Sequence, residues 1–224
     1  NTPPGDLDDI PAAHTGVRPY LWHQMAVRNG GNPLSDRAVR EARQAYYAST
    51  SFMDAQLGRV VEGLDKMGLA NDTVIAFWGD HGWSLGEHTH WQKMNLFEDV
   101  VRVPLIIAAP GHSGNGKTSR ALVECVDIYP TLAELCGLTP PAELEGASLV
   151  PLLDNPNRTV KEAAFTQIAF EGIRGLSVRT DRYRYNVWQG LGGGEELYDY
   201  QEDPGEFRNL AHVPAAQPAL ERHR

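Results

Sequence analysis

The most informative stretch of this sequence for the fold is Thr73-Val74-Ile75-Ala76-Phe77-Trp78-Gly79-Asp80-His81-Gly82. Its first six residues are mostly apolar or β-branched and predict a buried strand. A carboxylate and an imidazole follow at once, between two glycines that let the backbone turn sharply. Ligand sites of open α/β sheets collect at such strand ends. The adjacent oxygen and nitrogen donors of Asp80 and His81 suggest a metal site, with a capped turn and a hydrogen-bonded imidazole as the alternative.

A long helix is expected before this strand. Ser35 or Asp36 can cap its start, and apolar residues at three- and four-residue steps continue to about Met67. Gly68 supplies a C-terminal stop. Because a helix of roughly 30 residues is long for a globular domain, Ser49–Ser51 is expected to mark a bend or break.

A second strand and a helix are expected after the strand. Val103–Ala109 is another apolar, β-branched run, and Asp127–Leu135 predicts a helix with Pro130 in its first turn. Together with the long helix, this order of elements predicts an α/β layered domain over residues 1–156.

Residues 157–224 predict a small C-terminal α+β unit with an antiparallel sheet. Its expected strands cover residues 163–169, 176–180, 183–188 and 196–200. Around Arg184 and Asn186, polar residues alternate with aromatic or apolar ones, so this strand should show two different faces. Thr180-Asp181-Arg182 predicts a hairpin, and Asp203-Pro204-Gly205 predicts a tight turn.

The composition excludes some classes of function. The chain has 224 residues and a net charge of −9, which argues against a nucleic-acid partner. It has no apolar run of the ~20 residues that a membrane span needs. The two cysteines, Cys125 and Cys136, are predicted to be buried free thiols, with a disulfide across a strand-to-helix turn as the alternative.

The polar segment after Asp80 contains a candidate for anion binding. Lys93 follows His88, Thr89 and His90, thirteen positions after Asp80. Cationic groups close to a metal ligand would suit an anionic oxyacid ester. The alternative is an ordinary surface lysine.

The motifs in this region resemble the C-terminal signature of the sulfatase family in the alkaline phosphatase superfamily, and the nearest pattern is the iduronate-2-sulfatase type. The matching stretches are residues 46–49, 54–59, 69–71, 79–88, 91, 93, 97–98, 102–107, 110–111, 127–132, 137, 144–149, 178–185, 196–199 and 203–204. They keep the order and spacing of the family, so the resemblance implies an alkaline-phosphatase-like layered α/β fold.

The resemblance also implies roles for individual residues. Asp80 and His81 would ligate a divalent cation, usually calcium, for which hard oxygen donors are suited. Lys93 would be catalytic, contacting the sulfate ester oxygens. Trp83 and His88 would line the substrate pocket beside it. The substrate would be a sulfated small molecule or glycan, and the family occurs in periplasmic, extracellular or lysosomal locations.

The family's nucleophile is a formylglycine made from a Cys-x-Pro-x-Arg motif, and neither cysteine of this chain lies in one. Asp8-Asp9 resembles the family's N-terminal ligand pair in composition, but it lies in a loop-like stretch and is not assigned that role. The expectation is therefore a fragment whose partner is the N-terminal part of the same enzyme. Alone, the fragment should bind calcium weakly and hydrolyse no sulfate ester.

Two other readings stay open. A phosphodiesterase or phosphonate hydrolase of the same superfamily could use a similar metal loop, and a non-catalytic module could bind sulfated glycans. Glu98 and Arg102 are expected to form a structural ion pair that orders the loop. Asp54, on the long helix, is expected to be a buried hydrogen-bonding residue.

Overall fold

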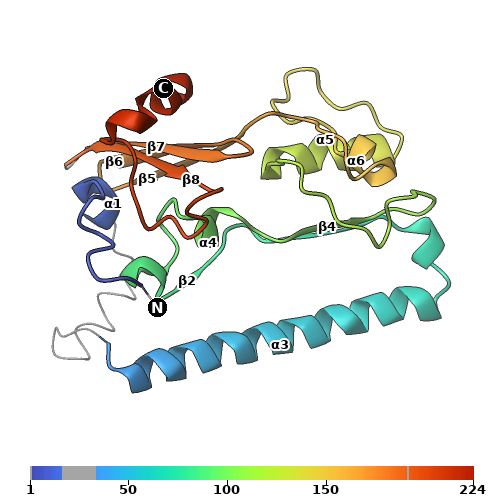
Figure 1. Ribbon diagram of the computed structural model, residues 1–224. Helices are drawn as coiled ribbons and strands as arrows, with labels where there is room; N and C mark the ends of the chain where they lie inside the picture. The colour runs from blue at the N-terminus through green and yellow to red at the C-terminus, as the bar shows by residue number, and fades with distance from the viewer. Residues whose placement is uncertain (1, 17–33, 191) are drawn as a thin grey trace.

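The computed structural model describes residues 2–16, 34–190 and 192–224, and these form helices and three antiparallel sheets (Figure 1). The helices are α1 (Ala12–Gly16), α3 (Asp36–Lys66), α4 (Glu98–Val101), α5 (Ile128–Leu135), α6 (Val150–Asp154) and α7 (Gln217–His223), with 3-10 helices η1 (Ala70–Asp72), η2 (Glu87–Thr89), η3 (Cys125–Asp127) and η4 (Pro214–Ala216). The strands are β1 (Ile75–Trp78), β2 (Ser84–Leu85), β3 (Trp91–Gln92), β4 (Leu105–Ala108), β5 (Ala164–Phe170), β6 (Ile173–Arg179), β7 (Tyr183–Gln189) and β8 (Gly194–Asp199). No helix of the described part is both long and apolar enough to span a membrane.

Helix α3 confirms the predicted long helix and its caps. The Ser35 hydroxyl accepts a hydrogen bond from the Ala38 amide, and Gly68 follows the helix with a left-handed φ of +71°. The predicted break is wrong, because α3 runs without interruption from Asp36 to Lys66, and the hydroxyls of Ser49 and Thr50 donate to carbonyls four residues earlier within it.

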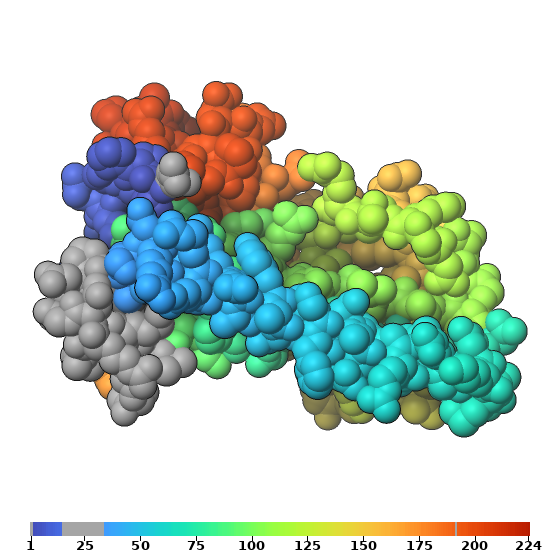
Figure 2. Space-filling model, turned by 90° about the horizontal axis from the view of Figure 1, so that it is seen from below, coloured from blue at the N-terminus to red at the C-terminus, as the bar shows by residue number. Residues whose placement is uncertain are grey.

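One side of α3 is not covered by the described residues. The helix lies along the surface of the molecule (Figure 2), and none of its residues is buried. Its exposed apolar side chains include Tyr47, Phe52 and Val60, and Met67 directly follows the helix; each of the four is more than 60% exposed. An apolar surface of this size is typical of a site where another segment or chain packs.

Strands β1 and β4 form where expected, but they are not the buried strands that the sequence predicts. They pair with each other antiparallel, with Trp78 opposite Leu105. Trp78 is 46% exposed and Ile106 is 58% exposed. The reason is that these strands form a sheet of only two, so the described residues leave part of its surface open.

The C-terminal sheet has the strand order β5-β6-β7-β8 and confirms the predicted antiparallel unit. Both faces of β7 are covered. Tyr185 packs with Leu197 and Leu220 of α7 on one face. Arg184 and Asn186, on the other face, are 2% and 0% exposed. The boundary between two units at residue 156 stays a prediction.

The N-terminal segment packs against this sheet through His14. The imidazole is fully buried between Phe97 and Trp188, with ring centroids 4.4 and 4.5 Å away. Its Nδ1 lies 2.7 Å from the Glu196 carboxylate, and its Nε2 accepts from the Leu96 amide at 3.4 Å. Segment 2–16 and the C-terminal sheet are therefore parts of one packed unit.

Two further expectations need correction. Cys125 and Cys136 are free, as predicted, but exposed, because they lie in η3 and just after α5 at the surface. Asp54 is exposed instead of buried, since α3 has no described neighbour on that side.

Replacing His14 with Leu should destabilise the fold, because it leaves the buried Glu196 carboxylate without the hydrogen bond that His14 Nδ1 donates to it. We expect the free energy of unfolding, measured with urea, to fall by about 3 kcal/mol. The double change His14→Leu, Glu196→Gln should recover part of that loss, since no buried charge then remains. Equal losses in the single and double variants would show that the pair contributes only through shape.

Candidate active site

The loop after β1 is held on both sides by backbone hydrogen bonds. The Gly79 amide donates to the Pro104 carbonyl at 3.1 Å. The amides of Gly82 and Trp83 donate to the carbonyls of Val100 and Asp99 in α4, at 2.7 and 3.1 Å. A Cβ on Gly82 would lie 2.1 Å from the Asp99 carbonyl oxygen, so close approach to α4 requires glycine at this position.

The structure brings Asp80, His81 and Lys93 together. His81 Nε2 lies 3.5 Å from Asp80 Oδ2 and 3.0 Å from Lys93 Nζ. His81 Nδ1 lies 2.8 Å from the Gly82 carbonyl oxygen, which can only accept, so Nδ1 carries the proton. The Lys93 ammonium can only donate, so Nε2 accepts from it and directs its lone pair at Lys93 Nζ.

A short hairpin returns Lys93 to the loop. Strands β2 and β3 pair Ser84 with Gln92 and Leu85 with Trp91, so the residues just outside this register, Trp83 and Lys93, lie at the same end. The residues on both sides of Lys93 have left-handed backbones, with φ of +72° at Gln92 and +78° at Met94. Such strained conformations of non-glycine residues cluster at functional sites.

Aromatic rings connect the cluster to α3. The Trp83 indole stacks near His81 and near Tyr46 of α3, at centroid distances of 6.3 and 6.1 Å. Arg43 of α3 donates through Nε to the Leu85 carbonyl at 2.9 Å. Tyr46 is a site residue that sequence reasoning missed, although it belongs to one of the matching motifs.

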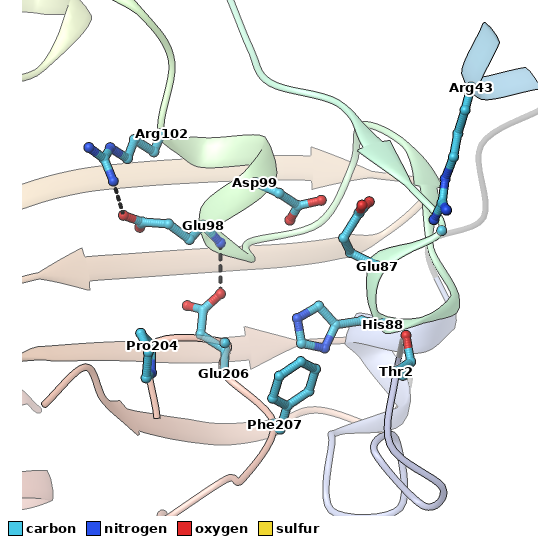
Figure 3. Close-up of a pocket in the computed structure, with 12 residues that line it drawn as sticks. Thr2, Arg43, Glu87, His88, Glu98, Asp99, Arg102, Pro204, Glu206 and Phe207 are labelled. Carbon is cyan, nitrogen blue, oxygen red and sulfur yellow. Dashed lines mark hydrogen bonds and ion pairs between the residues drawn. The ribbon is translucent and has the colours of Figure 1, made fainter. Parts of the chain in front are cut away.

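A cavity of about 480 Å³ lies beside α4 (Figure 3), and its lining contains none of the three cluster residues. Its lining includes His88, Glu98, Asp99, Arg102 and Glu206. Most of the cavity's charged groups have partners within the chain, whereas the Asp80 side chain of the cluster is 85% exposed.

His88 illustrates this difference. It is 5% exposed, its Nδ1 lies 3.0 Å from Asp6 Oδ2, and its ring stacks on Phe97 at 3.7 Å. His88 lines the cavity, next to Phe207 and Glu87 (Figure 3). Its predicted contact with substrate therefore stays a prediction.

Two groups near the loop have raised pKa values. Asp99 lies under the loop, and burial raises the pKa of its carboxyl although a hydrogen bond from Ser84 opposes the shift. Burial likewise raises the pKa of the Cys125 thiol, and the carboxylates of Asp127 and Asp80 add to the effect. The negative charge of Asp80 in the cluster thus reaches the Cys125 thiol.

The expected ion pair of Glu98 and Arg102 is present, with 3.8 Å between Arg102 Nη1 and Glu98 Oε1.

Asp80 and His81 fit a cation site only in part. The Asp80 side chain is 85% exposed and accessible to a cation, whereas His81 Nε2 lies 3.0 Å from Lys93 Nζ and is already engaged by it. Among residues 2–16, 34–190 and 192–224, no group of three or more His, Cys, Asp or Glu side chains could hold a metal ion. Calcium takes 6–8 oxygen ligands, which is more than Asp80 and His81 can supply.

Comparison with known proteins defines the class. The family model described as Sulfatase matches residues 3–138, and the model described as N-sulphoglucosamine sulphohydrolase, C-terminal, matches residues 86–222. The chain therefore belongs to the sulfatase family, and its fold is the C-terminal part of an alkaline-phosphatase-like α/β fold.

Individual relatives and solved structures are similar to this chain over most of its length. Iduronate 2-sulfatase of Homo sapiens is 32% identical over 80% of this chain, and the chain spans 45% of that relative's length. A protein solved in complex with its substrate D-glucosamine-2-N, 6-O-disulfate matches 90% of this chain and 43% of its own, with a TM-score of 0.80 and 26% identity. The phosphonate monoester hydrolase of Agrobacterium radiobacter matches 84% of this chain and 40% of its own, with a TM-score of 0.76 and 29% identity.

Replacing Gly82 with Ala should destabilise the chain, because the added methyl group would force the loop away from α4. We expect the free energy of unfolding in urea to fall by about 1–3 kcal/mol. The control is Gly63→Ala in α3, where a Cβ meets nothing within 4 Å. It should raise the free energy of unfolding by about 0.5–1 kcal/mol. Equal effects at both positions would contradict the close approach.

Proposed function

We propose that this chain is the C-terminal portion of an enzyme that hydrolyses sulfate esters, and that Asp80, His81 and Lys93 belong to its active site. The observation that supports this most directly is their convergence, with His81 Nε2 within 3.5 Å of both other side chains. The sulfatase family of the chain agrees with this reaction.

Each residue has a proposed task. Asp80 and His81 would hold a divalent cation, for which calcium is the candidate, and such an ion polarises a sulfate and helps to activate a nucleophile. Lys93 would donate hydrogen bonds to the ester oxygens and stabilise the negative charge that develops as the S–O bond breaks. Its place between two strained residues holds the ammonium toward the cluster.

The nucleophile and the remaining cation ligands would come from an N-terminal portion of the same enzyme. A formylglycine is the expected nucleophile, by resemblance to the family. The exposed apolar side of α3 and the open two-stranded sheet support such a partner, because both present surface that a further layer would cover. The relatives' greater length is consistent with this arrangement.

The substrate is proposed to be a sulfated sugar. The stacked rings of Trp83 and Tyr46 offer an apolar platform next to Lys93, and aromatic faces commonly contact ring-shaped ligands. Two of the similar proteins point the same way, one by its name and one by the sulfated glucosamine bound to it. A non-catalytic module that binds sulfated glycans would use the same surface.

A phosphonate or phosphate ester is the second candidate substrate, favoured by the similarity to a phosphonate monoester hydrolase. Lys93 does not separate the two, since sulfate and phosphonate esters have similar shapes. Turnover of an aryl sulfate and an aryl phosphonate by the full-length protein would distinguish them.

The 224-residue chain alone should bind calcium weakly and hydrolyse no aryl sulfate. Isothermal calorimetry should give a dissociation constant of about 10⁻³ M, the weak end of the range for calcium-binding proteins. Asp80→Asn should abolish the binding heat, and Asp54→Asn, a matched change on exposed α3, should not. Turnover of a chromogenic aryl sulfate by this chain alone would refute the proposed division of the site.

In the full-length enzyme, Lys93→Met should lower kcat/KM for a sulfate ester by about 100-fold or more, because one charge-stabilising group is lost from the transition state. Lys66→Met, at an exposed lysine of α3, is the control and should leave kcat/KM unchanged. A Lys93→Met enzyme with normal kcat/KM would remove Lys93 from the mechanism.

A further inference from the structure

We propose that Arg184, in strand β7 of the C-terminal sheet, is a positioning residue for the Asp80–His81–Lys93 cluster and acts through Glu98 and α4. The proposal rests on the proposed function only where it takes the cluster to be part of an active site. The structural link itself stands on contacts within this chain.

The first part of the link is a buried ion network. Arg184 is 2% exposed, and its guanidinium bonds to the Glu98 carboxylate, to Glu206 Oε1 at 2.8 Å and to the Tyr200 hydroxyl at 2.9 Å. It also donates to Ser177 Oγ at 3.1 Å. Burial opposes the charge on Arg184, but the two carboxylates and Tyr200 outweigh it, so its pKa is raised. One arginine thus holds two carboxylates that are far apart in the chain.

The second part of the link is the start of α4. Phe97 provides no side-chain cap for this helix, and the Glu98 amide donates instead to Glu206 Oε2 at 2.7 Å (Figure 3). The Glu98 carboxylate is therefore held by Arg184 and by the Tyr200 hydroxyl, which donates to Oε2 at 3.1 Å. The Glu98 amide is held by Glu206. Because α4 has only four residues, fixing its first residue fixes the helix.

The third part of the link joins α4 to the metal loop. The next two residues of α4, Asp99 and Val100, supply the carbonyls that accept from the Trp83 and Gly82 amides. These two amides directly follow Asp80-His81. A displacement of α4 would therefore be passed to the His81 imidazole within one or two residues.

Other arginines near Glu98 cannot replace Arg184. Arg102 lies 3.8 Å from Glu98 and its side chain is 79% exposed, so solvent screens this pair. Arg179 lies 3.9 Å away and its guanidinium stacks over the Tyr200 ring at 3.7 Å. Neither of these pairs has the short distance or the burial of the Arg184 contact.

Hydrogen–deuterium exchange of the 224-residue chain tests the link. In Arg184→Met we expect the amides of Gly82 and Trp83 to exchange at least about tenfold faster, because the local opening of the loop becomes easier. The control is Arg182→Met in the same hairpin. Arg182 forms a two-bond ion pair with Asp199, at 2.9 and 2.5 Å, and has no contact with Glu98, so its loss should leave both amides unchanged.

A second variant covers the case in which Arg184→Met does not fold. Glu98→Gln keeps the shape of the side chain and removes its charge, and it should also speed exchange at Gly82 and Trp83. Arg184→Lys, which keeps the charge, should restore part of the protection. The proposal is overturned if folded Arg184→Met or Glu98→Gln exchanges these two amides at the unaltered rate, or if exchange rises equally throughout β7 and β8.

The full-length enzyme separates this proposal from the proposed function. In Glu98→Gln the calcium concentration for half-maximal sulfate ester hydrolysis should rise about tenfold, as expected for a ligand shell that is less well held. Arg182→Met should leave it unchanged. If the full-length enzyme without substitutions hydrolysed no sulfate ester, the proposed function would be refuted. The exchange experiment would still decide whether Arg184 positions the loop.

Discussion

The close contact between the Gly82 backbone and α4 is the constraint on which the candidate site depends. The loop after β1 has no regular secondary structure of its own, so its shape comes from its neighbours. Two amides at the end of the Gly79–Trp83 loop donate to α4, and one at its start donates to Pro104. A glycine without Cβ allows this approach, and the carboxylate and imidazole of Asp80 and His81 are thereby presented from a fixed turn.

Buried polar groups dominate the interior between α4 and the C-terminal sheet. Arg184, Glu206, Glu196 and His14 are all almost completely buried, and each has a charged or hydrogen-bonding partner. Buried ion pairs contribute little net stability compared with apolar packing, because desolvation offsets much of the attraction. They do fix geometry, since the loss of one partner leaves an uncompensated charge. This interior therefore specifies how the C-terminal sheet sits against the loop.

Helix α3 and the sheet of β1 and β4 are, in contrast, exposed and partly apolar. Helix α3 carries exposed aromatic and aliphatic side chains, and β1 and β4 form a sheet of two strands. The aromatic contact of Tyr46 with Trp83 and the bond from Arg43 to Leu85 nevertheless attach the N-terminal half of α3 to the site. A partner that packs on α3 would thus lie next to the proposed substrate platform.

The sequence by itself determined most of the local structure and identified the three residues of the Asp80–His81–Lys93 cluster. Apolar periodicity and the Ser35 cap located α3, alternation and turn residues located the four-stranded sheet, and the spacing of Asp80, His81 and Lys93 named three residues that meet in space. Tertiary structure alone decided the pairing and exposure of β1, the continuity of α3 and the separate environment of His88. It also revealed that Arg184 joins the sheet to α4 across 86 positions. Local preferences act over a few residues and are written in short patterns, whereas burial and long-range ion pairing depend on which segments the folded chain brings into contact.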